Sequence, residues 1–271
     1  MIIAGLQKTT LIDYPWKIAC IVFLAGCSFR CPWCYSSELV LPSKIIKQPR
    51  ISEKELFDFL RARQGKLDGV VVCGGEPTVN KELPQFIQKI KNLGFSVKLD
   101  TNGSNPEMLK ILARSGTIDY VAMDIKASLN NVIYQQILNE GLTLDEVKES
   151  VEFLKQGIVD FEFRTTVVPT IHEKQDFLEI AKWIGGKNVK YYLQNFRPEK
   201  TIDPGFEKVK PYKDQWLKEV VQEISPYFKV CQARLVILNY YLFFAFLLSS
   251  EYLFNRLLKS HHFLYGVFCF L

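Results

Sequence analysis

The chain has 271 residues, which is room for one large domain or two small ones. Hydrophobic residues make up 48% of it and charged residues 23%, a balance that fits a packed globular protein and excludes a disordered or fibrous chain. The net charge of +5 is small, so the composition gives little support for nucleic-acid binding, and we expect none.

Cysteine usage points to a reducing compartment. The seven cysteines are odd in number, and three crowd into eight residues, which does not fit a disulfide framework. The N-terminus has no basic start followed by a sustained apolar run, so we expect no signal peptide and a cytoplasmic location. The three histidines, His172, His261 and His262, are too few for a histidine-rich metal site.

Apolar runs alternate with segments of helical spacing over the first 234 residues. Six runs rich in β-branched residues predict strands at 18–24, 69–73, 95–99, 120–125, 161–168 and 189–196. Six segments between them predict helices at 52–63, 81–93, 106–115, 144–156, 174–184 and 212–224. Six strand–helix units indicate an α/β fold with a parallel sheet, and both a partial open (β/α)6 barrel and a doubly wound sheet fit the pattern.

Polar residues follow the predicted strands where each strand ends. They include the cysteine loop after the first strand, Gly74–Pro77 after the second and Asp100–Gly103 after the third. Since the carboxyl ends of parallel strands meet at one edge, we expect the functional site there.

Residues 235–271 differ from the rest and are predicted to be a separate apolar tail. Eleven of these 37 residues are aromatic, and Leu235–Ser250 carries no charge. Sixteen uncharged residues fall short of the ~20 needed to span a membrane, so membrane association is not favoured. An anchor, an extra packed helix and translation past a natural stop codon all stay open. The predicted domain is therefore 1–234.

The densest chemical signal is Cys27, Cys31 and Cys34, spaced four and three residues apart. A tetrahedral zinc site needs a fourth ligand, and neither Cys20 nor a histidine is placed to supply it. An iron–sulfur cubane with three protein ligands keeps one iron open, where a small molecule can bind and receive an electron. A structural zinc site and three buried thiols are the alternatives.

The pattern Cys-x-x-x-Cys-x-aromatic-Cys resembles the signature of the radical S-adenosylmethionine (SAM) superfamily, and Gly74–Pro77 resembles a second motif of that family. Further segments are similar to its glycyl-radical-enzyme activating branch, usually labelled anaerobic ribonucleoside-triphosphate reductase activating protein. These segments are Gly5–Thr9 with Asp13–Pro15, Leu99–Gly103, Val121–Lys126 and Phe196–Pro198. The resemblance runs from residue 1 to about residue 234. Trp16 and Tyr35–Ser37 depart from the branch pattern.

The resemblance implies the partial open barrel, a 4Fe-4S cluster on the three cysteines and SAM as second cofactor. It implies reductive cleavage of SAM to a 5′-deoxyadenosyl radical, which removes a hydrogen atom from a glycine of an anaerobic glycyl-radical enzyme, above all ribonucleotide reductase. The partners would be that enzyme and an electron donor such as flavodoxin or ferredoxin. A radical SAM enzyme acting on a small molecule and a pyruvate formate-lyase-type activating enzyme are the alternatives.

The resemblance also assigns roles to individual residues. It places Gly74, Gly75 and Glu76 at the methionine amino group, and Asp124 and Lys126 at the ribose and methionyl ends of SAM. Trp33 and Tyr35 would supply aromatic surface near the adenine. The remaining expected cofactor contacts are Thr101, Asn102 and Arg164, and Asp100, Thr101 and Asp124 are a candidate cation site. An Asp-Thr-Asn-Gly turn without a ligand also fits residues 100–103.

Overall fold

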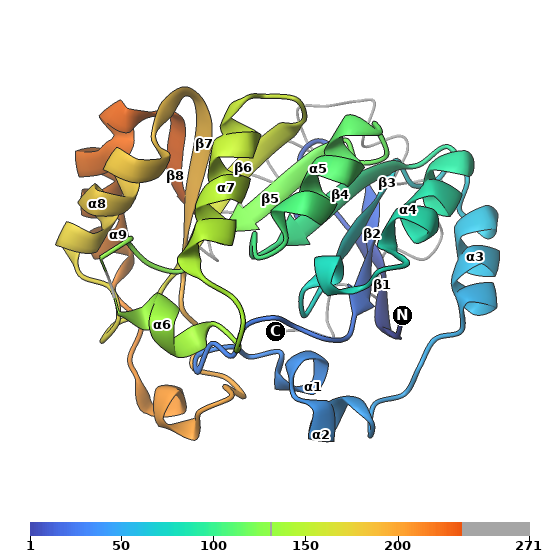
Figure 1. Ribbon diagram of the computed structural model, residues 1–271, viewed down its shortest axis with the longest axis horizontal. Coiled ribbons are helices and arrows are strands. Elements are labelled where there is room, and N and C mark those ends of the chain that lie inside the picture. Colours follow the sequence, from blue (N-terminus) through green and yellow to red (C-terminus); the bar gives the residue numbers. More distant parts are fainter. Residues whose placement is uncertain (131, 235–271) are drawn as a thin grey trace.

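A computed structural model describes residues 1–130 and 132–234 (Figure 1). Its eight strands form one sheet in chain order. They are β1 (Ile3–Thr10), β2 (Ala19–Leu24), β3 (Gly69–Gly74), β4 (Ser96–Thr101), β5 (Tyr120–Asp124), β6 (Asp160–Val167), β7 (Gly186–Asn195) and β8 (Phe228–Arg234). Strand β1 pairs antiparallel with β2, and every later pair is parallel. Among the described residues β1 and β8 do not pair, so the sheet is open.

Helices connect the parallel strands. The long ones are α3 (Glu53–Ala62), α4 (Leu83–Asn92), α5 (Pro106–Arg114), α7 (Leu144–Lys155), α8 (Lys174–Ile184) and α9 (Asp214–Ile224), and each coincides with a predicted helix. The short ones are α1 (Ser37–Val40), α2 (Pro42–Ile45) and α6 (Ile133–Ile137), with 3-10 turns at Pro77–Val79, Pro204–Lys208 and Ser225–Tyr227. Ser52 and Asn105 cap α3 and α5 by accepting backbone N–H groups, as their sequence positions predict.

The sheet has two different faces because side chains alternate along each strand. Val70 and Val72 belong to the large apolar core that also contains the buried sides of the long helices. Val71 belongs to a small cluster on the opposite side, with Tyr14 and Tyr120. We call this second side the inner face.

The fold confirms the predicted open α/β barrel, with eight strands where the sequence predicts six. Strands β1 and β8 escape prediction because edge strands have one neighbour and need no continuous apolar run. Most residues of both strands are partly exposed, and neither strand reads as a buried run. The predicted tail at 235–271 lies outside the described residues.

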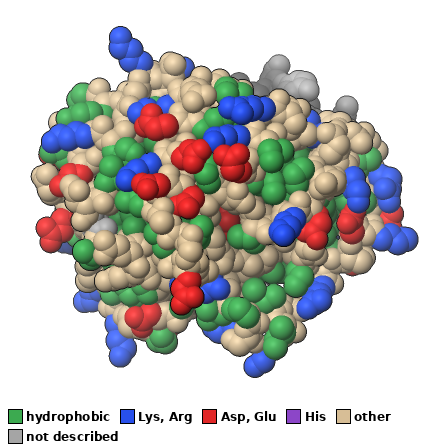
Figure 2. Space-filling view, in the orientation of Figure 1, with side chains coloured by type: hydrophobic (Ala, Val, Ile, Leu, Met, Phe, Trp, Pro, Cys, Tyr) green, Lys and Arg blue, Asp and Glu red, His purple; other side chains and the backbone are tan. Residues whose placement is uncertain are grey.

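The carboxyl ends of the parallel strands define one edge of the molecule. In Figure 1 the loop after β2, the helices α1, α2 and α6 and the turn at Pro204–Lys208 gather at this edge, below the sheet. Over the described part of the chain, no helix combines the length and apolarity needed to cross a bilayer. Figure 2 shows acidic and basic side chains interspersed over the helix-covered face.

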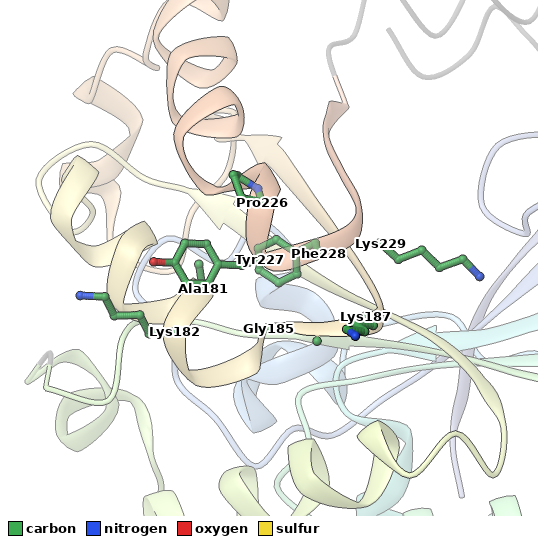
Figure 3. A pocket seen from close by; sticks show the side chains of 9 residues that line it. Ala181, Lys182, Gly185, Lys187, Pro226, Tyr227, Phe228 and Lys229 are labelled. Atoms are coloured by element: carbon green, nitrogen blue, oxygen red, sulfur yellow. The ribbon is translucent and has the colours of Figure 1, made fainter.

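A shallow pocket of about 450 Å³ lies at the opposite edge of the sheet, beside the amino ends of β7 and β8 (Figure 3). Its lining includes Gly185, Lys187, Tyr227 and Lys229. None of the residues predicted to be functional lines it.

Candidate functional site

The three clustered cysteines lie on the loop that leaves β2. Gly26 opens this loop with a φ of 99°, a conformation that favours glycine, and its N–H donates to the carbonyl of Leu39 at 2.8 Å. The Cys34 N–H donates to the Cys31 carbonyl at 3.0 Å and closes a turn between the last two cysteines. The loop is therefore folded back on itself, with its thiols near the edge of the sheet.

Two segments distant in sequence hold the loop in place. Phe29 forms an antiparallel bridge with Leu138 after α6, and Arg30 donates two hydrogen bonds from Nη1 to carbonyls of the loop itself, at 2.7 and 2.8 Å. From the other side, the N–H groups of Ile202 and Asp203 donate to the carbonyls of Cys34 and Pro32, both at 2.9 Å.

The three thiols of the loop lie in a largely buried environment. All three are free, and Cys31 is only 7% exposed. Burial raises the pKa of Cys27 to about 11 and that of Cys31 to about 12. The negative charge of Glu76 adds to the rise at Cys27, and the other two cysteines of the loop add to the rise at Cys31. Bound cations would relieve both effects. No three Cys, His, Asp or Glu side chains of the described residues are grouped to hold a single metal ion.

Gly74 and Gly75 are required by backbone packing. A Cβ at Gly74 would lie 2.2 Å from the Leu24 carbonyl oxygen, and one at Gly75 would lie 2.0 Å from that of Gly26. The Gly75 and Glu76 N–H groups donate to these same two carbonyls at 2.9 and 2.7 Å. The pair thus lets the end of β3 pack directly against the start of the cysteine loop.

Glu76 braces two loops at this edge and is fully buried. Its Oε1 accepts from the Thr78 N–H, the Thr78 hydroxyl and the Thr101 hydroxyl, and its Oε2 accepts from the Asn102 N–H at 2.6 Å. Burial raises the pKa of Glu76, and these four hydrogen bonds oppose that rise. The protein already supplies donors to both oxygens, so the side chain has little capacity left for the predicted ammonium contact.

Asn102 connects Glu76 to the cysteine loop. Its Nδ2 donates to the Ser28 hydroxyl at 3.0 Å and lies 3.8 Å from the Cys27 sulfur. Its Oδ1 accepts from the Ser104 N–H at 2.9 Å. The Asp-Thr-Asn-Gly turn therefore orients the Asn102 side-chain amide toward Cys27. The interpretation of residues 100–103 as a plain turn did not predict this contact.

Five charged side chains form a continuous network on the inner face. In order they are Lys98, Asp100, Arg164, Asp124 and Lys126, joined by ion pairs of 2.6, 3.1, 3.0 and 3.0 Å. Although burial opposes ionisation, Arg164 and Lys126 lower the pKa of Asp124 to about 2. Asp124, Cys31 and Cys34 all act to raise the pKa of Lys126 against the effect of burial, which couples the network electrostatically to the cysteine loop.

The predicted cation site gains no support from this network. Asp100 and Asp124 are bridged by the Arg164 guanidinium, and Thr101 donates to Glu76 instead of facing the two aspartates. The positive charge expected from an ion is supplied here by Arg164 with Lys98 and Lys126.

The backbone of Lys126 is held by buried side chains. Its N–H donates to the Tyr134 hydroxyl at 2.9 Å, and its carbonyl lies 2.8 Å from His172 Nε2. His172 Nδ1 accepts from the Val168 N–H at 3.0 Å, so Nε2 carries the proton and donates to Lys126. His172 and Tyr134 are buried, and we call them the Lys126 clamp.

The two predicted aromatic contacts lie in different environments. Trp33 is 4% exposed and packs against Phe206, with ring centroids 6.3 Å apart. Tyr35 is 42% exposed and lies under the Arg197 guanidinium, 5.2 Å from the ring centre. Of the pair, Tyr35 is the one with free ring surface.

Sequence reasoning missed Lys98, Tyr134 and the role of His172. Lys98 and Asp100 alternate within an apolar strand, as do Glu162 and Arg164, and charges at that spacing signal a polar face inside a barrel. No comparable signal marks Tyr134, because α6 is a single short turn.

Comparisons with known proteins agree with this geometry. Residues 21–184 match the model of the Radical SAM superfamily. A Methanocaldococcus jannaschii protein, provisionally named a glycyl-radical enzyme activating enzyme, is 32% identical over 81% of this chain and 90% of its own length. A 7-carboxy-7-deazaguanine synthase of Thermococcus kodakarensis is 30% identical over 50% of this chain and 58% of its own.

A solved structure with the same fold is that of Streptococcus suis SuiB bound to the precursor peptide SuiA. The TM-score is 0.58 at 16% identity, over 78% of this chain and 47% of SuiB, so this chain spans about half the length of SuiB. SuiB is also known bound to S-adenosylmethionine. With the family match covering more than half of the chain, this protein belongs to the radical SAM superfamily, whose members use a 4Fe-4S cluster and S-adenosylmethionine.

Proposed function

We propose that this protein is an activating enzyme that forms a glycyl radical on an anaerobic glycyl-radical enzyme, above all anaerobic ribonucleotide reductase. The observation that carries the proposal is the 32% identity, over 81% of this chain and 90% of the relative, with a protein provisionally named a glycyl-radical enzyme activating enzyme. When bound, the cluster and SAM supply an electron and a carbon radical that removes a hydrogen atom from the substrate.

The residues of the site have distinct tasks in this proposal. Cys27, Cys31 and Cys34 hold the cluster. Lys126, already ionised and fixed at its backbone, pairs with the SAM carboxylate. Because the oxygens of Glu76 accept donors from the protein, the ammonium contact falls to main-chain carbonyls of the Gly74–Glu76 turn. Tyr35 offers ring surface to the adenine.

The open sheet supports a protein as substrate. The described strands leave β1 and β8 unpaired with each other, so a loop of another protein can approach the inner face from the side. A flavodoxin or ferredoxin as electron donor, and a cytoplasmic location, remain predictions from the sequence.

A small-molecule substrate is the second candidate, because half of the chain is 30% identical to a 7-carboxy-7-deazaguanine synthase. Electron paramagnetic resonance distinguishes activation of a glycyl-radical enzyme from a reaction on a small molecule. The reconstituted, reduced protein is mixed with SAM and anaerobic ribonucleotide reductase, and a glycine-centred radical on the reductase is expected. If SAM is cleaved but the reductase acquires no radical, the proposed function is wrong.

A further inference from the structure

Within residues 1–130 and 132–234, one carboxylate oxygen of Glu162 on β6 has no hydrogen-bond partner. The residue is 1% exposed. Its Oε2 accepts from the Tyr120 hydroxyl at 2.9 Å and from Arg234 Nη2 at 2.8 Å. Its Oε1 is buried and accepts no hydrogen bond from the described residues. Because a buried acceptor without a donor is unfavourable, this oxygen is suited to a donor from outside the chain.

The side chains around Glu162 form a group that is continuous with the charged network. Phe161 and Phe163 belong to the helix-covered core, so Glu162 and Arg164 share the inner face. Glu162 is thus about 7 Å along the strand from the residue that bridges Asp100 and Asp124. The Arg164 guanidinium also feels its negative charge.

Aromatic rings support the charged members of this group. The Arg234 guanidinium lies 3.9 Å from the centre of the Tyr192 ring, and the Lys190 ammonium lies 5.0 Å from that of Tyr120. Arg234 is 26% exposed at its side chain, whereas Glu162 is almost fully buried. The group therefore extends from the interior of the sheet face toward solvent.

The hydrogen-bonding groups of Glu162 Oε1 and the Arg234 guanidinium are complementary to those of an amide. A free carboxylate oxygen accepts an N–H, and an adjacent guanidinium with five N–H groups can donate to a carbonyl. We propose that Glu162 and Arg234 bind an amide group of the substrate, which donates its N–H to Glu162 Oε1 and accepts from Arg234. The inference rests on the function proposed above, under which the amide belongs to the backbone of the protein substrate; a cyclic amide of a guanine-type heterocycle has the same chemistry.

The substitution Glu162→Gln tests the free oxygen selectively. Tyr120 and Arg234 both donate to the Oε2 position, so they keep the glutamine carbonyl there and place the amide NH₂ at the Oε1 position. An acceptor becomes a donor at the free site with little change in volume. Asp160→Asn is the matched control, because it removes one negative charge from the same strand and face at an exposed position.

The measurement is the KM for ribonucleotide reductase, with kcat, the Kd of SAM and the unfolding midpoint recorded for each protein. Glu162→Gln is expected to raise KM about tenfold or more, while the Kd of SAM and the unfolding midpoint stay close to those of Asp160→Asn. An unchanged KM contradicts the subsite. Equal rises in KM and in the Kd of SAM also contradict it, since they indicate a general disturbance of the inner face.

A separate arm distinguishes failure of the proposed function from failure of the subsite. If the wild type forms no radical on the reductase, binding of guanosine and of 1-methylguanosine, which lacks the lactam N–H, is measured by saturation-transfer NMR. One outcome supports the subsite with a small-molecule substrate: the wild type binds guanosine but not 1-methylguanosine, and Glu162→Gln binds neither. No guanosine binding to the wild type overturns the subsite as well.

Discussion

Lys126 is the residue at which the cysteine loop and the charged network meet. Its ammonium pairs with Asp124 at 3.0 Å and is coupled electrostatically to Cys31 and Cys34, while its backbone is held by Tyr134 and His172. Burial alone would lower the pKa of Lys126, but the surrounding negative charges raise it, so the side chain stays ionised. A fixed positive charge coupled to the cysteine loop suits recognition of a carboxylate.

We predict that Lys126→Met raises the Kd of SAM about tenfold or more, because a charge-assisted contact is lost. Tyr134→Phe removes only the hydroxyl that accepts from the Lys126 N–H and is expected to raise the Kd about threefold. The two effects should not add, since the clamp acts through Lys126. Equilibrium dialysis of SAM with the reconstituted single and double variants checks this.

The matched control is Tyr191→Phe, which removes a buried hydroxyl that donates to Thr165, one hydrogen bond further from Lys126. A Tyr134→Phe effect that persists undiminished in the Lys126→Met background would contradict the clamp. An unchanged Kd in Lys126→Met would contradict the role given to Lys126 itself.

His172 predicts a pH dependence of stability. Burial lowers its pKa below the usual value near 6.5, and its Nδ1 must stay unprotonated to accept from Val168. The unfolded chain therefore binds a proton at higher pH than the folded chain, and the free energy of unfolding falls as the pH drops below about 6.5 until the folded pKa is reached.

Urea unfolding at about pH 8 and about pH 5.5 measures this dependence. His172→Gln is expected to lose less stability between the two values than the wild type does, because it lacks the titrating ring. Equal losses in both proteins would show that other groups dominate in this range.

At the scale of elements, the site depends on how closely the end of β3 packs against the loop after β2. Gly75 has no room for a Cβ, because the Gly26 carbonyl would lie 2.0 Å away. The same junction carries two backbone hydrogen bonds between the segments. The pair Gly74–Gly75 therefore fixes the position of the cysteine loop relative to Glu76 and its hydrogen bonds to Thr101 and Asn102.

Gly75→Ala is accordingly expected to destabilise the protein by more than about 2 kcal/mol and to lower the iron content after reconstitution. Gly186→Ala is the control, because its Cβ would meet only a valine side chain at 3.2 Å. Chemical unfolding and iron analysis measure the two effects. Normal stability and iron content in Gly75→Ala would contradict the packing argument.

For the whole molecule, the sequence predicts the parallel core of the sheet because buried strands need long apolar runs, and all six are present in the structure. The cysteine loop, the glycine motif and Asp124–Lys126 also follow from motifs and strand ends. The edge strands β1 and β8 leave no such signal. The hydrogen bonds of Glu76 with Thr101 and Asn102, and that of His172 with Lys126, join segments 25 to 46 residues apart, which spacing along the chain cannot reveal.

The division of the chain at residue 234 stays a prediction that truncation can test. All contacts described for the site are made by residues 1–234. A chain ending after Arg234 is therefore expected to bind iron and SAM as the full chain does, with a Kd within about twofold. Loss of iron binding on truncation would show that residues 235–271 are needed for the site.

We propose that Cys27, Cys31 and Cys34 hold the cluster of this radical SAM enzyme. The most direct test of this proposal is anaerobic reconstitution with iron and sulfide, reduction, addition of SAM and assay of 5′-deoxyadenosine for the wild type, Cys31→Ala and Cys231→Ala. The wild type and Cys231→Ala, altered at a partly exposed cysteine of β8, should form the product, and Cys31→Ala should form none. A Cys31→Ala protein that keeps its iron and still cleaves SAM would contradict the account.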